Sequence, residues 1–219
     1  MGWIESRRKG DTGIGKTIED LLGIPENNAG EPDCIYEGYE VEIKGHRVRS
    51  KSMITLFTLE PGTRHLHDVE LMREYGYKNG KGRQALKITL TTQRFTPQGL
   101  KLRSDLANRT ISIIDASGYE PWVWSISDIR LKLHNLCVVY ADSKKEAGQE
   151  YFRVESAVLA LGLDEECFFK LVEDGHVKID LRMNMKPTGA SRNHGTGWRL
   201  PRWEELVRCY GKKQTVLEP

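Results

Sequence analysis

An aspartate, a glutamate and a lysine lie close together in the stretch 32–44, and these residue types together can hydrolyse a phosphodiester. Over 39–44, aromatic or aliphatic residues alternate with charged ones, which is the period of a half-buried β-strand. Glu37-Gly38 lies between two such runs and can serve as a two-residue hairpin turn. Counting outward from that turn places Asp33 directly opposite Glu42, with the Cβ atoms roughly 4.5–5.5 Å apart.

Two carboxylates held opposite one another repel, and a divalent cation between them removes the repulsion. Mg²⁺ is typically bound through one or two carboxylates. Lys44 lies two residues beyond Glu42 and therefore points to the same face of the strand. In such a group the metal lowers the pKa of a bound water, and the ammonium positions the nucleophile or offsets charge on the phosphate. An exposed strand face decorated with charges is the alternative interpretation, and it stays open at this point.

A second alternating strand is predicted over 176–183. Its odd-numbered residues from 177 onward are apolar, and its even-numbered residues from 178 to 182 are charged. Asp180 and Arg182 therefore share one face, where Arg can donate to guanine O6 and N7 and a carboxylate can accept from cytosine N4. The basic loop that follows, 186–196, adds further hydrogen-bonding groups. A plain surface ion pair is the alternative.

Residues 10–17 match the phosphate-loop pattern G-x-x-x-x-G-K-[ST] letter for letter. A helix is predicted directly after the motif, with Ile18, Leu21 and Leu22 as its apolar stripe. A true phosphate loop follows a buried apolar strand, whereas residues 5–9 are charged or polar throughout. A nucleotide hydrolase is therefore the disfavoured interpretation.

The elements around these stretches alternate between strands and helices, which predicts an α/β or α+β fold. Strands are predicted at 52–58, 86–95, 99–103, 110–115, 119–125, 136–140 and 151–156, and helices at 128–135, 164–174 and 201–210. Residues 62–85 are rich in Gly, Arg, Lys and His with little periodicity, and they are predicted to form a long surface excursion.

The composition is that of an ordinary soluble protein, with 38% hydrophobic and 29% charged residues among 219. No run of apolar residues is long enough to span a membrane, and no signal-peptide core is present. The four cysteines are far apart and are predicted to be free thiols in a reducing cytoplasm. Basic residues gather at 73–87 and acidic ones at 142–174, which suits a protein with one face on phosphates.

Several of these segments together resemble the MvaI/BcnI family of type II restriction endonucleases, which are related to the mismatch-repair nicking enzyme MutH. The matching segments keep their order across nearly the whole chain and are 2–3, 8–10, 12–17, 19–22, 32–33, 42–44, 56–58, 178–182, 194–196 and Arg199. The presence of the 12–17 segment in that family also accounts for the false phosphate loop.

The resemblance implies one nuclease domain over 1–219, with a PD-(D/E)xK core of mixed sheet flanked by helices and a DNA-recognition lobe. The core is expected mainly in 1–60 and 127–175, and the recognition elements mainly in 62–125 and 176–199. The implied enzyme is a monomer that cleaves double-stranded DNA at a short, C·G-rich site with Mg²⁺. Mn²⁺ is expected to substitute, and Ca²⁺ to bind without turnover. Neither ATP nor a membrane is expected to take part, and the expected location is the cytoplasm of a prokaryote.

The resemblance also assigns residues. Asp33 and Glu42 match the metal ligands, with the Ile43 carbonyl as a third, and Lys44 matches the catalytic lysine. Glu19 matches an acidic residue on the first helix that lies near the site. The residues matched to DNA contacts, or lying in the same segment, are Asp180, Arg182, Arg192, Asn193, His194 and Arg199. A MutH-like strand-nicking enzyme and a catalytically silent DNA-binding module remain as alternatives.

Overall fold

The computed structural model of the protein describes residues 2–25 and 32–217, and the chain divides into two compact units. The first unit comprises Met1–Ile54, His134–Asp164 and Val207–Pro219, and the second comprises Thr55–Leu133 and Glu165–Leu206. The expected assignment of a catalytic core to 1–60 and 127–175, and of recognition elements to 62–125 and 176–199, stays a prediction. In the described part of the chain, no helix has the length and apolar character needed to cross a membrane.

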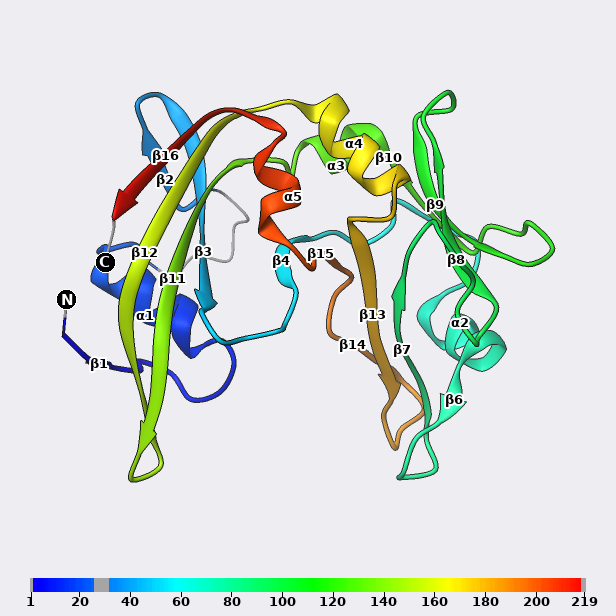
Figure 1. Ribbon diagram of the computed structural model, residues 1–219. Coiled ribbons are helices and arrows are strands. Elements are labelled where there is room, and N and C mark those ends of the chain that lie inside the picture. Colours follow the sequence, from blue (N-terminus) through cyan, green and yellow to red (C-terminus); the bar gives the residue numbers. More distant parts are fainter. Residues whose placement is uncertain (1, 26–31, 218–219) are drawn as a thin grey trace. The chain divides into compact units, whose positions relative to one another are not determined.

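The first unit is built on a six-stranded mixed sheet (Figure 1). Its strands, in spatial order, are β1 (Ile4–Glu5), β12 (Gln149–Leu163), β11 (Asn135–Glu146), β3 (Tyr39–Arg47) and β2 (Cys34–Tyr36), with β16 (Tyr210–Leu217) also paired to β12. The pair β3–β11 is parallel, whereas β2–β3 and β11–β12 are antiparallel. The predicted mixed sheet is therefore confirmed.

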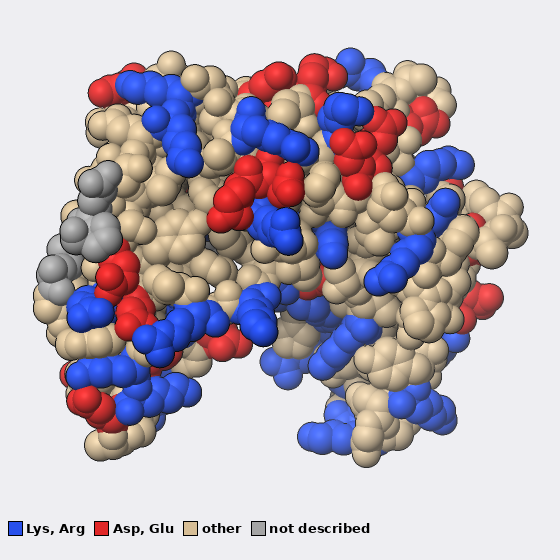
Figure 2. Space-filling view, viewed as in Figure 1, with Lys and Arg blue, Asp and Glu red and all other residues tan. Residues whose placement is uncertain are grey.

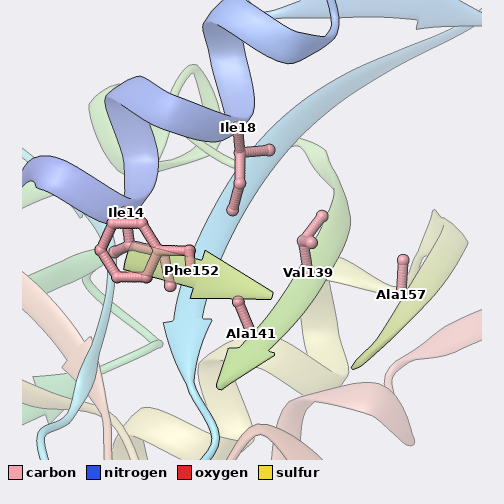
Figure 3. Packing of buried hydrophobic residues seen from close by; sticks show 6 residues of the cluster. All are labelled: Ile14, Ile18, Val139, Ala141, Phe152 and Ala157. Carbon is pink, nitrogen blue, oxygen red and sulfur yellow. The ribbon is translucent and has the colours of Figure 1, made fainter. Parts of the chain in front are cut away.

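Helix α1 (Gly13–Leu21) covers one face of this sheet. Ile14 and Ile18 point from the helix toward apolar residues of the strands, which are Val139, Ala141, Phe152 and Ala157 (Figure 3). Ile43 of β3 packs against the same cluster. Gly45 permits this close approach, because a Cβ there would lie 2.8 Å from Ile18 Cδ1 and 3.1 Å from Ile14 Cγ1. The odd-numbered residues of β3 thus face the helix, and the even-numbered residues point to the opposite face of the sheet.

The second unit contains two further sheets and four short helices (Figure 1). One sheet has the order β5 (Thr63–Arg64), β10 (Trp122–Ser125), β9 (Thr110–Asp115), β8 (Leu100–Asp105). The other carries the residues predicted to contact DNA and is therefore called the recognition sheet below. Its order is β4 (Ile54–Thr58), β15 (Gly197–Leu200), β13 (Lys178–Met185), β7 (Gln84–Leu90), β6 (Tyr77–Lys78), with β14 (Ser191–Asn193) also paired to β13. The helices are α2 (Asp68–Tyr75), α3 (Ile126–Arg130), α4 (Glu165–Glu173) and α5 (Trp203–Val207).

An aromatic core joins these two sheets. Trp198 of the recognition sheet stacks on Phe57, with ring centroids 5.4 Å apart, and meets the edge of Trp124 from the other sheet at 5.7 Å. The apolar residues of β13 are buried as well, and they are Ile179, Leu181 and Met183. Because side chains alternate along a strand, this burial leaves the even-numbered residues of β13 on the opposite, polar face of the recognition sheet.

The prediction for 62–85 is wrong, because this stretch contains α2 and two short strands. Leu71 and Met72 of α2 are fully buried, but two adjacent apolar residues give no visible helical period. The N-terminus of the helix is held by a capping box between His67 and Glu70, and His is not among the usual N-cap residues. The helix was therefore missed because its sequence signals are weak.

The expectation of four free thiols is wrong for two of them. Cys34 and Cys137 are free, whereas Cys167 and Cys209 are disulfide-bonded. The spacing of cysteines along a sequence excludes a C-x-x-C motif, but it does not determine which sulfurs meet in the fold. Burial raises the pKa of the Cys137 thiol to about 11, and burial followed by the Asp33 charge raises that of Cys34. Both thiols are therefore protonated at neutral pH and act as packing groups.

Replacing Gly45 by valine should weaken the packing of α1 against β3. The added methyl groups would overlap Ile14 and Ile18, so we expect a loss of about 1–3 kcal/mol in the free energy of unfolding. Urea unfolding followed by circular dichroism measures this loss. Gly80→Ala is the control, since a Cβ at Gly80 meets nothing within 4 Å. Equal stability of Gly45→Val and wild type would contradict the packing described.

Candidate active site and DNA-recognition face

The β2–β3 hairpin brings the predicted catalytic residues together. Glu37 and Gly38 both have positive φ, 50° and 82°, as the central residues of a type I′ turn require. Pairing then runs from Tyr36↔Tyr39 to Cys34↔Val41, as counted from the sequence. The next position along each strand is Asp33 on one side and Glu42 on the other.

Hydrogen bonds fix the three polar side chains at this end of the hairpin. Asp33 Oδ2 accepts from the backbone N–H of Ile43 at 2.6 Å, although Asp33 lies outside β2. Lys44 Nζ donates to Glu42 Oε1 at 2.5 Å, and both side chains are partly exposed. Since Ile43 and Gly45 face α1, Glu42 and Lys44 lie on the opposite face of the sheet.

The donor set at this position suits a hard divalent cation. The two carboxylates and the Ile43 carbonyl offer only oxygen, which is what Mg²⁺ takes in proteins. Within residues 2–25 and 32–217, no three His, Cys, Asp or Glu side chains are arranged to hold a metal ion. The expected site needs only two side chains, with solvent and the phosphate completing the shell, so this finding fits the donors present.

Glu19 is carried by α1, and its expected place near the hairpin carboxylates stays a prediction. It is half-buried on α1, and its Oε1 turns back toward Gly15, 4.0 Å from where a Cβ on that glycine would be. The structure therefore does not gather Glu19, Asp33 and Glu42 into a three-carboxylate cluster.

The phosphate-loop motif is part of the packing of α1 rather than a nucleotide site. The helix begins at Gly13, inside the motif, and the N–H of Lys16 already donates to Thr12 O at 3.2 Å. Thr17 is only 1% exposed, and its hydroxyl donates to Gly13 O and accepts from Arg7 N. The groups that would cradle phosphates and a metal in such a loop are therefore committed within the protein.

On the polar face of the recognition sheet, Asp180 links two neighbouring strands. Its Oδ1 accepts from the Thr89 hydroxyl and its Oδ2 from Arg199 Nη1, each at 2.6 Å. Asp180 is buried, with 7% exposure, and Arg199 is partly exposed. The carboxylate thereby fixes the direction in which the Arg199 guanidinium points. A Cβ on Gly197, opposite Asp180, would lie within 3.7 Å of both Arg199 and Arg182, so a glycine leaves these side chains room.

Arg182 and Glu60 hold the 192–196 segment from two sides. Arg182 Nη2 donates to the carbonyls of His194 and Gly195, at 3.1 and 3.4 Å. Glu60 Oε1 accepts from Thr196 N at 2.8 Å, and its Oε2 accepts from Asn193 Nδ2 at 3.2 Å and from Arg64 Nη2 at 2.7 Å. The backbone of this segment is thus fixed by charged side chains.

Among the six residues matched to DNA contacts, exposure separates two groups. Arg192 and His194 are exposed, whereas the side chains of Asp180, Arg182, Asn193 and Arg199 are engaged with the protein. Sequence reasoning missed Glu60 and Thr89, which support the others. Thr89 had a usable signal, because it lies in an alternating strand, but nothing in the sequence indicates that this strand pairs with β13.

Comparison with known proteins agrees with this geometry. The sequence matches the MvaI/BcnI restriction endonuclease family over residues 1–208. The chain belongs to this family. Its fold is similar to the structure of restriction endonuclease MvaI with its cognate DNA substrate, with 29% identity, a TM-score of 0.82, and coverage of 99% of this chain and 92% of that one. MvaI in the absence of DNA matches with 26% identity, a TM-score of 0.57 and the same coverage. No curated protein sequence matches.

The resemblance inferred from the sequence is confirmed. As an MvaI/BcnI family member, the protein is a type II site-specific deoxyribonuclease that binds DNA, with a mixed α+β fold. Enzymes of this family generally use divalent metal ions. Because the family match includes residues 10–17, the interpretation of this stretch as the phosphate loop of a nucleotide hydrolase has no remaining support.

Replacing Glu60 by alanine should loosen the 192–196 segment of this family member. Three hydrogen bonds to one carboxylate are lost, and we expect about tenfold weaker binding of cognate DNA, measured by fluorescence anisotropy. Glu74→Ala, which removes an exposed carboxylate from α2, is the matched control. Unchanged affinity in Glu60→Ala would show that the segment does not depend on this carboxylate.

Proposed function

We propose that this endonuclease cleaves both strands of double-stranded DNA at a short, C·G-rich sequence, with Mg²⁺ as its cofactor and as a monomer. The hydrogen bond from Ile43 N–H to Asp33 is the observation that carries the proposal, because it places Asp33 beside Glu42 and Lys44. Catalysis is assigned to the first unit and recognition to the second. Mn²⁺ substitutes for Mg²⁺, Ca²⁺ binds without turnover, and ATP takes no part. The enzyme acts in the cytoplasm of a prokaryote.

Asp33, Glu42 and the Ile43 carbonyl would hold the metal ion, which lowers the pKa of a bound water and offsets charge on the phosphate. Lys44 is the catalytic lysine. Its ammonium, steadied by Glu42 in the structure, orients the attacking water and offsets the charge that develops on the phosphate oxygens. Glu19 is an accessory acid on α1 in this proposal and not a metal ligand.

Recognition is assigned to the polar face of the recognition sheet and the 192–196 segment. Arg199, oriented by Asp180, donates to guanine O6 and N7, and the lone pairs left on Asp180 accept from cytosine N4. Arg192 and His194 are exposed and contact DNA directly. Arg182 and Asn193 border the same surface, and their side chains are bonded to the protein. Arg182 acts in this proposal by holding the backbone of the segment through the His194 and Gly195 carbonyls.

Asp33→Ala should abolish cleavage and spare DNA binding, because it removes a metal ligand without touching the recognition sheet. On unmethylated plasmid DNA we expect the cleavage rate to fall at least about a hundredfold. Gel electrophoresis follows the reaction, and anisotropy checks binding. Asp11→Ala removes an exposed carboxylate of the same unit and serves as the control. Full activity in Asp33→Ala would overturn the assignment. Wild-type enzyme that stops at nicked circles would favour the strand-nicking alternative.

Removal of metal should stop the reaction completely and reversibly. Chelation with EDTA is expected to abolish cleavage, added Mg²⁺ to restore it, and Ca²⁺ to support binding alone, because the site offers only oxygen donors. The same assay in the absence of ATP, with Lys16→Ala alongside wild type, should show full activity. Cleavage that persists in EDTA would contradict the proposed cofactor.

A further inference from the structure

The second unit has a basic pocket outside the recognition face described above. It has a volume of about 390 Å³ and lies between the end of α2, the β6–β7 hairpin and the turn that joins β13 to β14. Four of the residues that line it are basic, and they are Arg73, Lys78, Arg83 and Lys186. The described residues that line the pocket include no Asp or Glu. Figure 2 shows Lys and Arg side chains gathered at the lower end of this unit, where Figure 1 places the two hairpin ends.

The charges around this pocket are not neutralised by any carboxylate among the described residues. In the part of the chain that the structure describes, none of the four basic side chains forms an ion pair. Other arginines of the same unit do have carboxylate partners, since Arg64 pairs with Glu60 and Arg199 with Asp180. Four like charges around one hollow repel, and an anion in the hollow would relieve that repulsion.

Hydrogen bonds hold the two turns that form the walls of the pocket. In the β6–β7 hairpin, Asn79 Oδ1 accepts from the N–H groups of Lys81 and Arg83, at 2.9 and 3.2 Å. In the β13–β14 turn, Lys186 N donates to Ala190 O at 2.8 Å, and Gly189, with φ of 84°, donates to Lys186 O at 3.0 Å. Arg83 and Lys186 thus lie on turns whose backbones are already held by hydrogen bonds. This lowers the entropic cost of binding a ligand between them.

We propose that this pocket binds the phosphodiester backbone of DNA outside the recognised base pairs. The inference rests on the proposed function. The pocket shares strands β7 and β13 with the recognition face, and six residues separate Lys186 from Asp180 along the chain. That separation is about 20 Å, the length of about six base pairs, so the contact falls on flanking DNA. Such a contact adds affinity and fixes position without reading sequence.

The double variant Arg83→Ala/Lys186→Ala tests the pocket. Binding is measured by anisotropy in Ca²⁺ over a range of salt, with a duplex that extends well beyond the cleavage sequence and a short one that barely covers it. For the long duplex, we expect the slope of log affinity against log salt to shrink by about two and the affinity to fall severalfold. Affinity for the short duplex and the position of the cut should not change.

Arg94→Ala/Lys170→Ala is the matched control, because it removes one arginine and one lysine that are exposed in the same unit outside the pocket. Thermal unfolding verifies that both variants are folded, and Lys186→Glu, which alters a single exposed side chain, repeats the test with a reversed charge. An unchanged slope, an equal loss in the control or an equal loss with the short duplex would overturn the proposal. Wild-type protein that neither binds nor cuts DNA would instead refute the proposed function.

Discussion

Both functional surfaces depend on one property of an extended chain, which is that successive side chains point to opposite faces of a sheet. In β3 the odd-numbered residues Ile43 and Gly45 meet helix α1, so Glu42 and Lys44 must point to the other face. In β13 the aromatic core takes the odd-numbered residues and leaves Asp180 and Arg182 on the polar face. Apolar burial on one side therefore determines which polar side chains are displayed on the other.

Carboxylates serve two purposes in this protein. Asp33 and Glu42 stand at the open end of a hairpin, where a cation is expected to bring them together. Asp180 and Glu60 instead accept hydrogen bonds from an arginine and from neutral donors of the recognition sheet and its loop. These two carboxylates orient arginine side chains. A guanidinium with one edge held by a carboxylate can offer its remaining N–H groups in a defined direction. Acidic residues thus organise a surface that is proposed to bind a polyanion.

The hairpin could be predicted from the sequence because its turn and its alternation are local signals, and the register counted from Glu37-Gly38 is the observed one. The sequence also indicated the polar face of β13. Helix α2 was missed because its two buried apolar residues are adjacent and its N-cap is a histidine. The roles of Glu60 and Thr89 were beyond local reasoning, because they arise from contacts with residues more than 90 positions away in the chain. Contacts between residues far apart in the chain leave no local pattern in the sequence from which they could be predicted.

The 192–196 segment has a backbone anchored by Arg182 and Glu60 and two side chains, at 192 and 194, that remain exposed. In such a loop, the contacts that hold the backbone are separate from the side chains that are exposed to solvent. Under the proposed function, substitutions at the exposed positions would alter which bases are preferred while the anchors keep the main chain in place. Divergence of target preference among relatives can then proceed through single codon changes, without passing through misfolded intermediates.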